Sequence, residues 1–216
     1  MSEEKKSAKQ LKHSKKKKDN VLYWSIAFII AVIILFYSAG KFFSNDSEYE
    51  IVEYNNWIFT EIGGMWWFEW QEGANVYQIP LRFNPLEVED VKISGRLDSS
   101  KFNSGKTIYI TFDLSNESSQ NFPVLSLAAA ELTQNIATAI NRTPVAACTN
   151  NQSDACIDRP IKSCENTNDP VIFLAEKRGA SPSITLDSGC IVLKGGSFDL
   201  IKAVDRLLYQ WYGIME

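Results

Sequence analysis

One uncharged, strongly apolar stretch near the start of the chain constrains the fold more than any other feature. From Val21 to Gly40 no residue carries a charge, and Ile26 to Phe36 is almost entirely aliphatic or aromatic. As a helix, these twenty residues extend about 30 Å, the hydrocarbon thickness of a bilayer. Tyr23, Trp24 and Tyr37 lie near the two ends, where aromatic rings favour the membrane interface. The stretch therefore predicts one transmembrane helix, with residues 21–40 in contact with the lipid bilayer.

A lysine-rich tail precedes this stretch and predicts its orientation. Residues 1–20 contain eight Lys and three acidic residues, so their net charge is +5, and because the whole chain carries −4 the remainder carries −9. Basic segments beside a membrane span remain on the cytoplasmic side. We therefore expect a cytoplasmic N-terminus in the plasma membrane and a C-terminal domain outside the cell. A basic tail can also bind nucleic acid, but its position directly before the apolar stretch favours the topological role.

Two other interpretations of the apolar stretch stay open. A cleaved signal peptide has a shorter apolar core of ~7–15 residues, although Ser38, Ala39 and Gly40 are small enough for a peptidase. A buried core helix rarely lacks polar residues for five turns. We expect an uncleaved signal-anchor and four segments: a basic tail (1–20), a transmembrane helix (21–40), a linker (41–48) and an extracytoplasmic domain (49–216).

All four cysteines lie in the expected outer domain: Cys148, Cys156, Cys164 and Cys190. Oxidising conditions outside the cell let disulfide bonds persist. The spacings of 8, 8 and 26 residues do not resemble the closely spaced pairs of a zinc site. The cysteines therefore predict two disulfides, and the chain predicts no metal site and no other cofactor. Four cysteines allow three pairings, and their spacing does not choose among them.

Hydrophobic periodicity predicts an α+β domain. The clearest strand is Thr107–Leu114, in which Ile108, Ile110 and Phe112 share one face. Apolar residues recur at helical spacing from Pro123 to Asn141 and again after Ser197, which suits a helix N-cap. Other predicted strands are 49–54, 57–62, 65–70, 76–83, 171–175, 183–187 and 190–194, and a polar loop covers 149–169. This order predicts a mixed sheet with two helices packed on one face, stapled by disulfides.

The reactive side chains argue against most enzymes. The only histidine is His13, in the predicted cytoplasmic tail, so the outer domain has no imidazole base for a Ser-His-Asp or Cys-His site. Asp187-Ser188-Gly189 imitates the active-site loop of an aspartic protease, which needs a second carboxylate from another lobe or subunit. Only 27 residues follow Gly189, too few for an enclosing half-barrel. We therefore read this segment as a tight turn and predict no catalytic residue.

Two further groups of polar residues permit weaker hypotheses. The carboxylates of Glu69 and Glu72, or of Glu87, Glu89 and Asp90, are paired closely enough in sequence to suggest glycoside hydrolysis. Carboxylates this near one another are more often a solvated surface. The loop 149–169 is rich in Asn and Asp and offers oxygen ligands for calcium, but it lacks EF-hand spacing.

An aromatic cluster between residues 57 and 70 is the most suggestive feature of the outer domain. On a strand, Trp66, Phe68 and Trp70 share one face. Aromatic residues on strands most often belong to the core. The alternatives are a binding face that stacks sugar rings or another protein's side chains, and a contact with the membrane surface.

Several segments of the outer domain resemble one family. They read YNNWIFTEIGGMWWFEW, YQIPLRFNPLEVEDV and IYITFDLS, followed by an isolated Cys164, a Cys-Ile-aliphatic strand ending at Gly195 and a C-terminal helix. In this order they resemble uncharacterised single-span membrane proteins of small-genome archaea. The chain departs from that family at Leu114, where Pro is usual, and by carrying Cys148 and Cys156. The family has no assigned activity, so the resemblance implies an architecture and a topology.

The resemblance also implies a disulfide pairing. Cys148 and Cys156 are the two cysteines that the family lacks, and added cysteines tend to occur as a bonded pair. They enclose a short polar segment that can curl back without crossing a regular element. Cys164 is then left to pair with Cys190.

Taken together, these features predict a non-enzymatic binding or structural protein of the cell envelope. Its expected partner is an unidentified envelope protein or glycan, and no nucleic acid. Two alternatives stay open: an extracellular enzyme that acts on glycan or peptide, and a pilin-like subunit.

Overall fold

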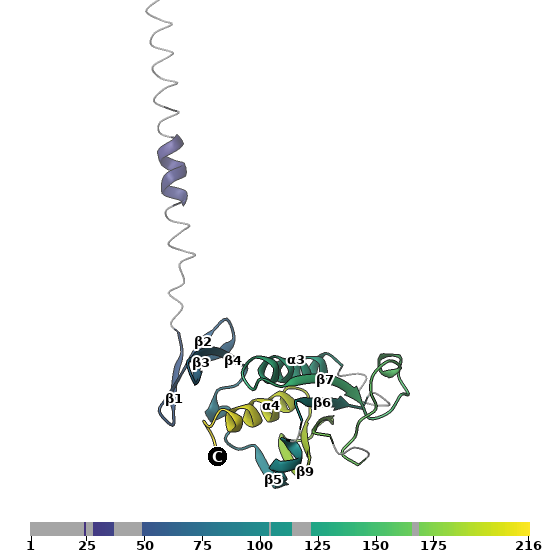
Figure 1. The fold of residues 1–216 in the computed structure, drawn as a ribbon. Coiled ribbons are helices and arrows are strands. Elements are labelled where there is room, and N and C mark those ends of the chain that lie inside the picture. Colours follow the sequence, from purple (N-terminus) through teal and green to yellow (C-terminus); the bar gives the residue numbers. More distant parts are fainter. Residues whose placement is uncertain (1–23, 25–27, 37–48, 104, 114–121, 166–168) are drawn as a thin grey trace, which may run out of the picture. The chain divides into compact units, whose positions relative to one another are not determined.

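The computed structural model describes residues 24, 28–36, 49–103, 105–113, 122–165 and 169–216. The chain divides into two compact units, residues 1–48 and 49–216. In the first unit, residues 28–36 are helical and most of their side chains are exposed (Figure 1). No helix among the described residues is long and apolar enough to cross a membrane. Most of the predicted span, with the tail and the linker, lies outside the described residues, so the span stays a prediction.

The second unit begins with an antiparallel meander of four strands: β1 (Ile51–Tyr54), β2 (Trp57–Ile62), β3 (Met65–Glu72) and β4 (Asn75–Leu81). Its first two turns have left-handed backbone. The φ angle is 47° at Asn55 and 67° at Asn56, then 64° at Gly63 and 77° at Gly64. Asn and Gly adopt this conformation at the lowest cost, which explains the tight turns at these positions. All four strands expected between residues 49 and 83 are present.

Six further strands form a second, mixed sheet: β5 (Lys92–Leu97), β6 (Thr107–Phe112), β7 (Thr143–Cys148), β8 (Val171–Glu176), β9 (Ser183–Ser188) and β10 (Cys190–Gly195). Their order across the sheet is β5-β9-β10-β8-β6-β7. Only β9 and β10 are antiparallel, and the other neighbours are parallel. Ser188 and Gly189 form the turn between β9 and β10, as expected, with φ of 54° at Ser188.

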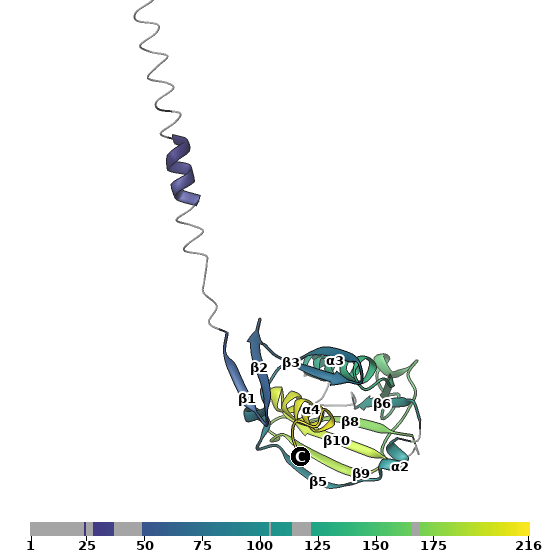
Figure 2. The same ribbon diagram turned by 60° about the vertical axis from the view of Figure 1, so that its left-hand side comes forward.

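Two long helices, α3 (Phe122–Thr138) and α4 (Phe198–Trp211), pack on one side of the six-stranded sheet (Figure 2). The start of α4 lies so close to the end of β10 that a Cβ atom added to Gly195 would be 2.3 Å from the backbone nitrogen of Leu200. Ser197 precedes α4 as predicted, but its side chain makes no capping hydrogen bond. The described residues of the domain also contain three short helices: η1 (Pro85–Val88), α2 (Ser99–Phe102) and η3 (Asp154–Cys156).

The structure confirms the α+β class and a mixed sheet, but the prediction of a single sheet is wrong. The chain leaves the meander because a capping box at Asn84 turns it into η1. The Asn84 side chain accepts a hydrogen bond from the Glu87 amide (3.1 Å), and the Glu87 carboxylate accepts one from the Asn84 amide (2.8 Å). The strands β5 and β7 were not predicted, since neither shows a clear apolar alternation.

Helix α4 is buried on more than one side because it packs against both sheets. Its residues 200–209 are buried except for Lys202. Toward the meander, the Tyr209 ring contacts Phe59 and Phe68, with ring centroids 5.6 and 5.9 Å away. The Tyr209 hydroxyl donates a hydrogen bond to the carbonyl oxygen of Phe83 (2.6 Å). One helix therefore joins the two sheets into a single core.

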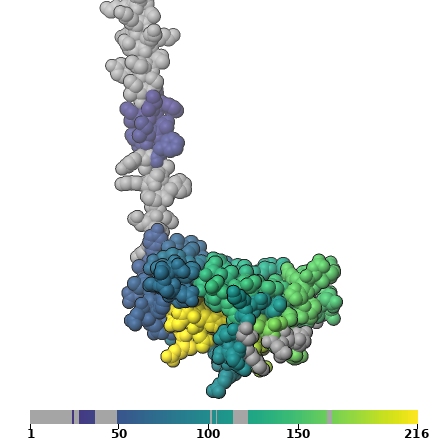
Figure 3. All heavy atoms as spheres, viewed as in Figure 1, coloured from purple at the N-terminus to yellow at the C-terminus, as the bar shows by residue number. Residues whose placement is uncertain are grey.

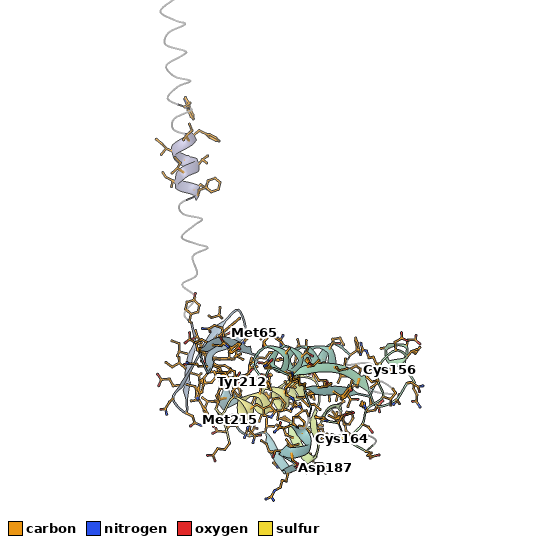
Figure 4. All side chains as sticks on the ribbon, viewed as in Figure 1. Met65, Cys156, Cys164, Asp187, Tyr212 and Met215 are labelled. Carbon is orange, nitrogen blue, oxygen red and sulfur yellow. A yellow bond between two sulfur atoms is a disulfide. The ribbon has the colours of Figure 1, made fainter. Side chains whose placement is uncertain are left out.

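The two disulfides confirm the predicted pairing. Cys148, at the end of β7, is bonded to Cys156 in η3, and Cys164 is bonded to Cys190 at the start of β10. Figure 4 labels Cys156 and Cys164, which mark the segment that the bridges hold. The predicted stapled loop between β7 and β8 is thus tied to the six-stranded sheet at two positions.

Candidate functional site

The two faces of the meander have different surroundings. Alternation along β3 directs Trp66 and Phe68 inward, where they are 7% and 2% exposed. Trp70 is half-buried, and its ring centroid lies 5.1 Å from that of Tyr212. Trp66 and Phe68 therefore belong to the core, and Trp70 packs against it beside Tyr212 at the end of α4. The outward face is formed by the residues between them.

Thr60 lies at the centre of the outer face. In the strand register Thr60 lies opposite Ile51 of β1 on one side and opposite Trp67 of β3 on the other. Ile58 and Ile62 lie two positions away along β2 and point to the same side. The three isoleucines remain 60%, 59% and 49% exposed in chain order. They lie around Thr60 on a face that no described element covers.

A concavity of about 540 Å³ lies on the meander at this surface. Its lining includes the outward side chains Ile58, Thr60, Ile62, Trp67, Glu69 and Gln78, together with Asn56, Trp57 and Phe68. Figure 3 shows residues 49–81 at one end of the domain, next to the C-terminal helix and away from the loop between β7 and β8. The concavity is therefore formed by consecutive strands at one end of the molecule.

Two hydrogen bonds hold polar groups in place around the concavity. The indole Nε1 of Trp67 donates to the carbonyl oxygen of Ile62 (3.2 Å), which orients the ring along the sheet. The Gln78 amide donates to one carboxylate oxygen of Glu69 (2.6 Å). Glu69 is exposed, and no second donor among the described residues reaches its carboxylate. An oriented aromatic ring and an exposed carboxylate thus lie side by side.

The meander is also strongly acidic. Between Tyr49 and Leu81 the sequence has no Lys, Arg or His, and it has five glutamates: Glu50, Glu53, Glu61, Glu69 and Glu72. Such a segment produces a negative potential that no basic side chain of its own reduces. Strand alternation places two of these glutamates, Glu53 and Glu69, on the outer face with the exposed isoleucines.

A second group of polar residues is buried where the meander meets the helices. Asp205 of α4 is fully buried, and its Oδ2 accepts hydrogen bonds from the backbone amides of Arg82 (3.0 Å) and Phe83 (2.9 Å). Glu131 of α3 is 7% exposed, and its Oε2 lies 3.4 Å from Nε of Arg82. This acid pair therefore connects α3, α4 and the end of β4.

The pKa values in this acid pair are raised. Burial raises the pKa of Asp205 well above its ordinary value, and the charge of Glu131 raises it further. Burial also raises the pKa of Glu131, while its hydrogen bond with Asp205 and the charge of Arg82 oppose that shift. The ionised form of Asp205 is therefore disfavoured in the folded chain. Neither residue lines the concavity, so the acid pair has the position of a structural element.

The other polar candidates are separate from this site. Asp187 is exposed at the end of β9, opposite Arg96 of β5 in the strand register, and Figure 4 shows it well away from Met65 of the meander. Glu87 belongs to the capping box, and Glu89 accepts a hydrogen bond from the Tyr54 hydroxyl (3.4 Å). These positions do not bring two carboxylates together in a cleft.

In the loop between β7 and β8, the polar side chains stabilise the loop itself. Asn150 donates to Asp113 (3.1 Å) and accepts from the Gln152 amide (3.1 Å), and Lys162 pairs with Asp169 (2.6 Å). Across the parts of the chain that the structure describes, no group of three or more His, Cys, Asp or Glu could hold a metal ion.

Sequence reasoning singled out the right strands but not the residues of the outer face. The alternation that groups Trp66 with Phe68 also groups Trp67 with Glu69, and Ile58 with Thr60 and Ile62. The signal was therefore present in the sequence. The sequence alone did not show which of the two faces meets α4.

The chain matches no known family model, no curated protein and no solved structure. The resemblance to anchored proteins of small-genome archaea stays a prediction.

Proposed function

We propose that this chain is a single-pass plasma-membrane protein whose domain, residues 49–216, binds another component of the cell envelope. The uncharged stretch 21–40 is the anchor, the lysine tail remains in the cytoplasm, and residues 41–48 link the anchor to the domain. Both disulfides lie in the part placed outside the cell, where such bonds persist.

One observation carries the binding role: three isoleucines remain exposed around Thr60 on an uncovered sheet face. A single exposed apolar residue is ordinary, but a contiguous apolar surface marks an interaction site. The domain has no histidine, and the acid pair Glu131 and Asp205 is enclosed by packing. We therefore place binding, and no catalysis, at the outer face of the meander.

The topology is tested by protease added to intact cells that make the chain with a C-terminal tag. We expect the tag to be destroyed without lysis, because the domain lies outside. A tag that survives on intact cells and is cleaved only after lysis would show the opposite orientation.

The binding surface is tested by a photo-reactive amino acid placed at Ile58 of the full chain in living cells. Ile157, in the loop between β7 and β8, is a matched control because it is 64% exposed, against 59% for Ile58. We expect a discrete cross-linked product from position 58 and none from position 157. The same products from both positions, or none from either, would contradict a specific surface on the meander.

A further inference from the structure

We infer that the outer face of the meander binds a protein segment in which Lys or Arg side chains stand among aliphatic ones. This inference depends on the proposed function, because it names the ligand class of the same surface. The inference rests on two features of this face: its exposed aliphatic side chains and its negative charge.

The aliphatic part accepts apolar side chains. Ile51, Ile58 and Ile62 surround Thr60, and the last two line the concavity. Covering such a surface is favourable in proportion to the apolar area removed from water, at about 25 cal/mol per Å². Aliphatic side chains of a partner fit this surface better than sugar hydroxyls, which need polar neighbours.

The charged part selects a cation. Glu69 and Trp67 lie two positions apart on β3, so they point to the same side, and both line the concavity. A Lys or Arg placed there meets a carboxylate and the face of an indole ring, and both attract positive charge. Residues 49–81 include no basic side chain, so no cation within the meander competes for this position, and the Gln78 amide bonds only one of the two Glu69 carboxylate oxygens.

Charge also disfavours the other occupants. A second copy would bring the same acidic face and repel it, and anionic lipid headgroups are repelled in the same way. A neutral glycan leaves the negative charge unpaired. The chain's own lysine tail lies across the membrane in the proposed topology. A basic and aliphatic segment of another protein is the occupant that satisfies both properties.

The test measures binding of two short synthetic peptides to the full chain in lipid nanodiscs of neutral lipid. In one peptide Lys alternates with Val, and in the other Glu alternates with Val. We expect the Lys peptide to bind and the Glu peptide not to bind. Binding should weaken when NaCl rises from about 50 to about 500 mM, because salt screens exposed charges.

Variants identify the surface. Glu69→Gln removes one charge with no change in shape and should weaken binding of the Lys peptide about three- to five-fold, as expected for an exposed ion pair. Asp187→Asn makes the same charge change on an exposed residue of the other sheet and should leave affinity unchanged. Trp67→Ala should weaken binding about ten-fold or more, as for an aromatic anchor.

Three outcomes would overturn this inference: equal binding of both peptides, no effect of Glu69→Gln, or no binding of the Lys peptide. An oligosaccharide that binds the full chain but not Trp67→Ala, while the Lys peptide does not bind, would identify a glycan site. If the cross-link at Ile58 persists while the Lys peptide fails, the ligand class alone is wrong. If the cross-link is also absent, the proposed function is wrong.

Discussion

The two sheets of residues 49–216 differ in the face that points away from α4. In the six-stranded sheet that face exposes Ser94, Thr185 and Lys194 and keeps Phe173 and Val192 half-buried, whereas in the meander it exposes Ile58 and Ile62. A polar second face is the usual arrangement for a sheet with one side in water. The exposed isoleucines of the meander depart from this arrangement.

The two sheets also differ in how their strands are connected along the chain. The meander joins consecutive strands through short turns, while the six-stranded sheet is mostly parallel and needs long crossovers. Both disulfides belong to the six-stranded sheet and its loop. The covalent cross-links of this domain therefore lie in one sheet, and the exposed isoleucines lie in the other.

The largest expected effect comes from comparing two neighbouring residues on opposite faces of β3. Phe68→Ala empties a site that is 2% exposed and packed against Tyr209 and Tyr212. It should lower the free energy of unfolding by about 3–5 kcal/mol. Trp67→Ala removes a half-exposed ring and should cost about 1 kcal/mol or less. Denaturant unfolding of both variants in detergent, followed by near-UV circular dichroism, measures the difference.

The same two variants also test whether the two faces of the meander differ in burial. A cost for Trp67→Ala as large as that for Phe68→Ala would mean that the outer face is covered within the chain itself. The proposed binding surface would then not exist.

The success of sequence reasoning was also unequal between the two sheets. All four strands of the meander could be predicted, because Asn55-Asn56 and Gly63-Gly64 interrupt clear apolar patterns. In the six-stranded sheet β5 was missed, since KISGRL contains Gly95 and two charged residues. β7 was missed because its sequence TPVAAC has Pro144 at its second position and mostly small side chains after it. Both are edge strands, whose pairing depends on partners far along the chain.

The sequence located the strands of the candidate site but did not show which of their two faces is exposed. Period-two alternation defines two faces of β3, and the Trp66 face was interpreted first as core and only second as a binding face. That face is buried because Tyr209 and Tyr212 of the C-terminal region pack on it. A contact between residues so distant in sequence has no local signal. The acid pair was missed for the same reason, because Glu131 and Asp205 lie on different helices.

The second prediction concerns the disulfides of the six-stranded sheet. Loss of the bridge between Cys164 and Cys190 releases a loop of 26 residues, for which the chain-entropy model gives roughly 3–4 kcal/mol. Loss of the bridge between Cys148 and Cys156 releases a loop of only 8 residues and should lower the free energy of unfolding by less. Thermal unfolding should therefore show a larger fall in Tm for Cys190→Ser than for Cys156→Ser, and peptide mapping without reductant checks the pairing.

A fall in Tm that is equal, or larger for Cys156→Ser, would contradict this order. It would show that the short bridge stabilises more than its own loop. A cross-linked peptide joining Cys156 to Cys164 would instead show that the pairing itself is wrong.

The smallest expected effect concerns the junction between the two sheets and its dependence on pH. The pKa of Asp205 is raised in the folded state by burial and by Glu131, while in the unfolded chain it has its ordinary value near 4. Between these two values the folded state holds a proton that the unfolded state has lost. Stability from this group is therefore complete below about pH 4 and falls as pH rises toward the folded pKa.

Asp205→Asn separates this contribution from all others. The amide oxygen can still accept from the amides of Arg82 and Phe83, and its NH₂ group can donate to Glu131 as the protonated acid does. We expect the variant to lie within about 1 kcal/mol of the wild type at about pH 5. As pH rises to about 8.5, the wild-type Tm should fall more than the variant's.

The single histidine, His13, lies outside residues 49–216, so no imidazole of the outer domain titrates within this pH window. Any pH dependence removed by Asp205→Asn then belongs to the acid pair. Parallel Tm curves for the two proteins would mean that Asp205 titrates at its ordinary pKa, and hence that water reaches the junction. Because Asp205 binds the backbone where β4 ends and Tyr209 binds Phe83 beside it, a steeper wild-type curve would show that the attachment of the meander to α4 weakens as Asp205 loses its proton.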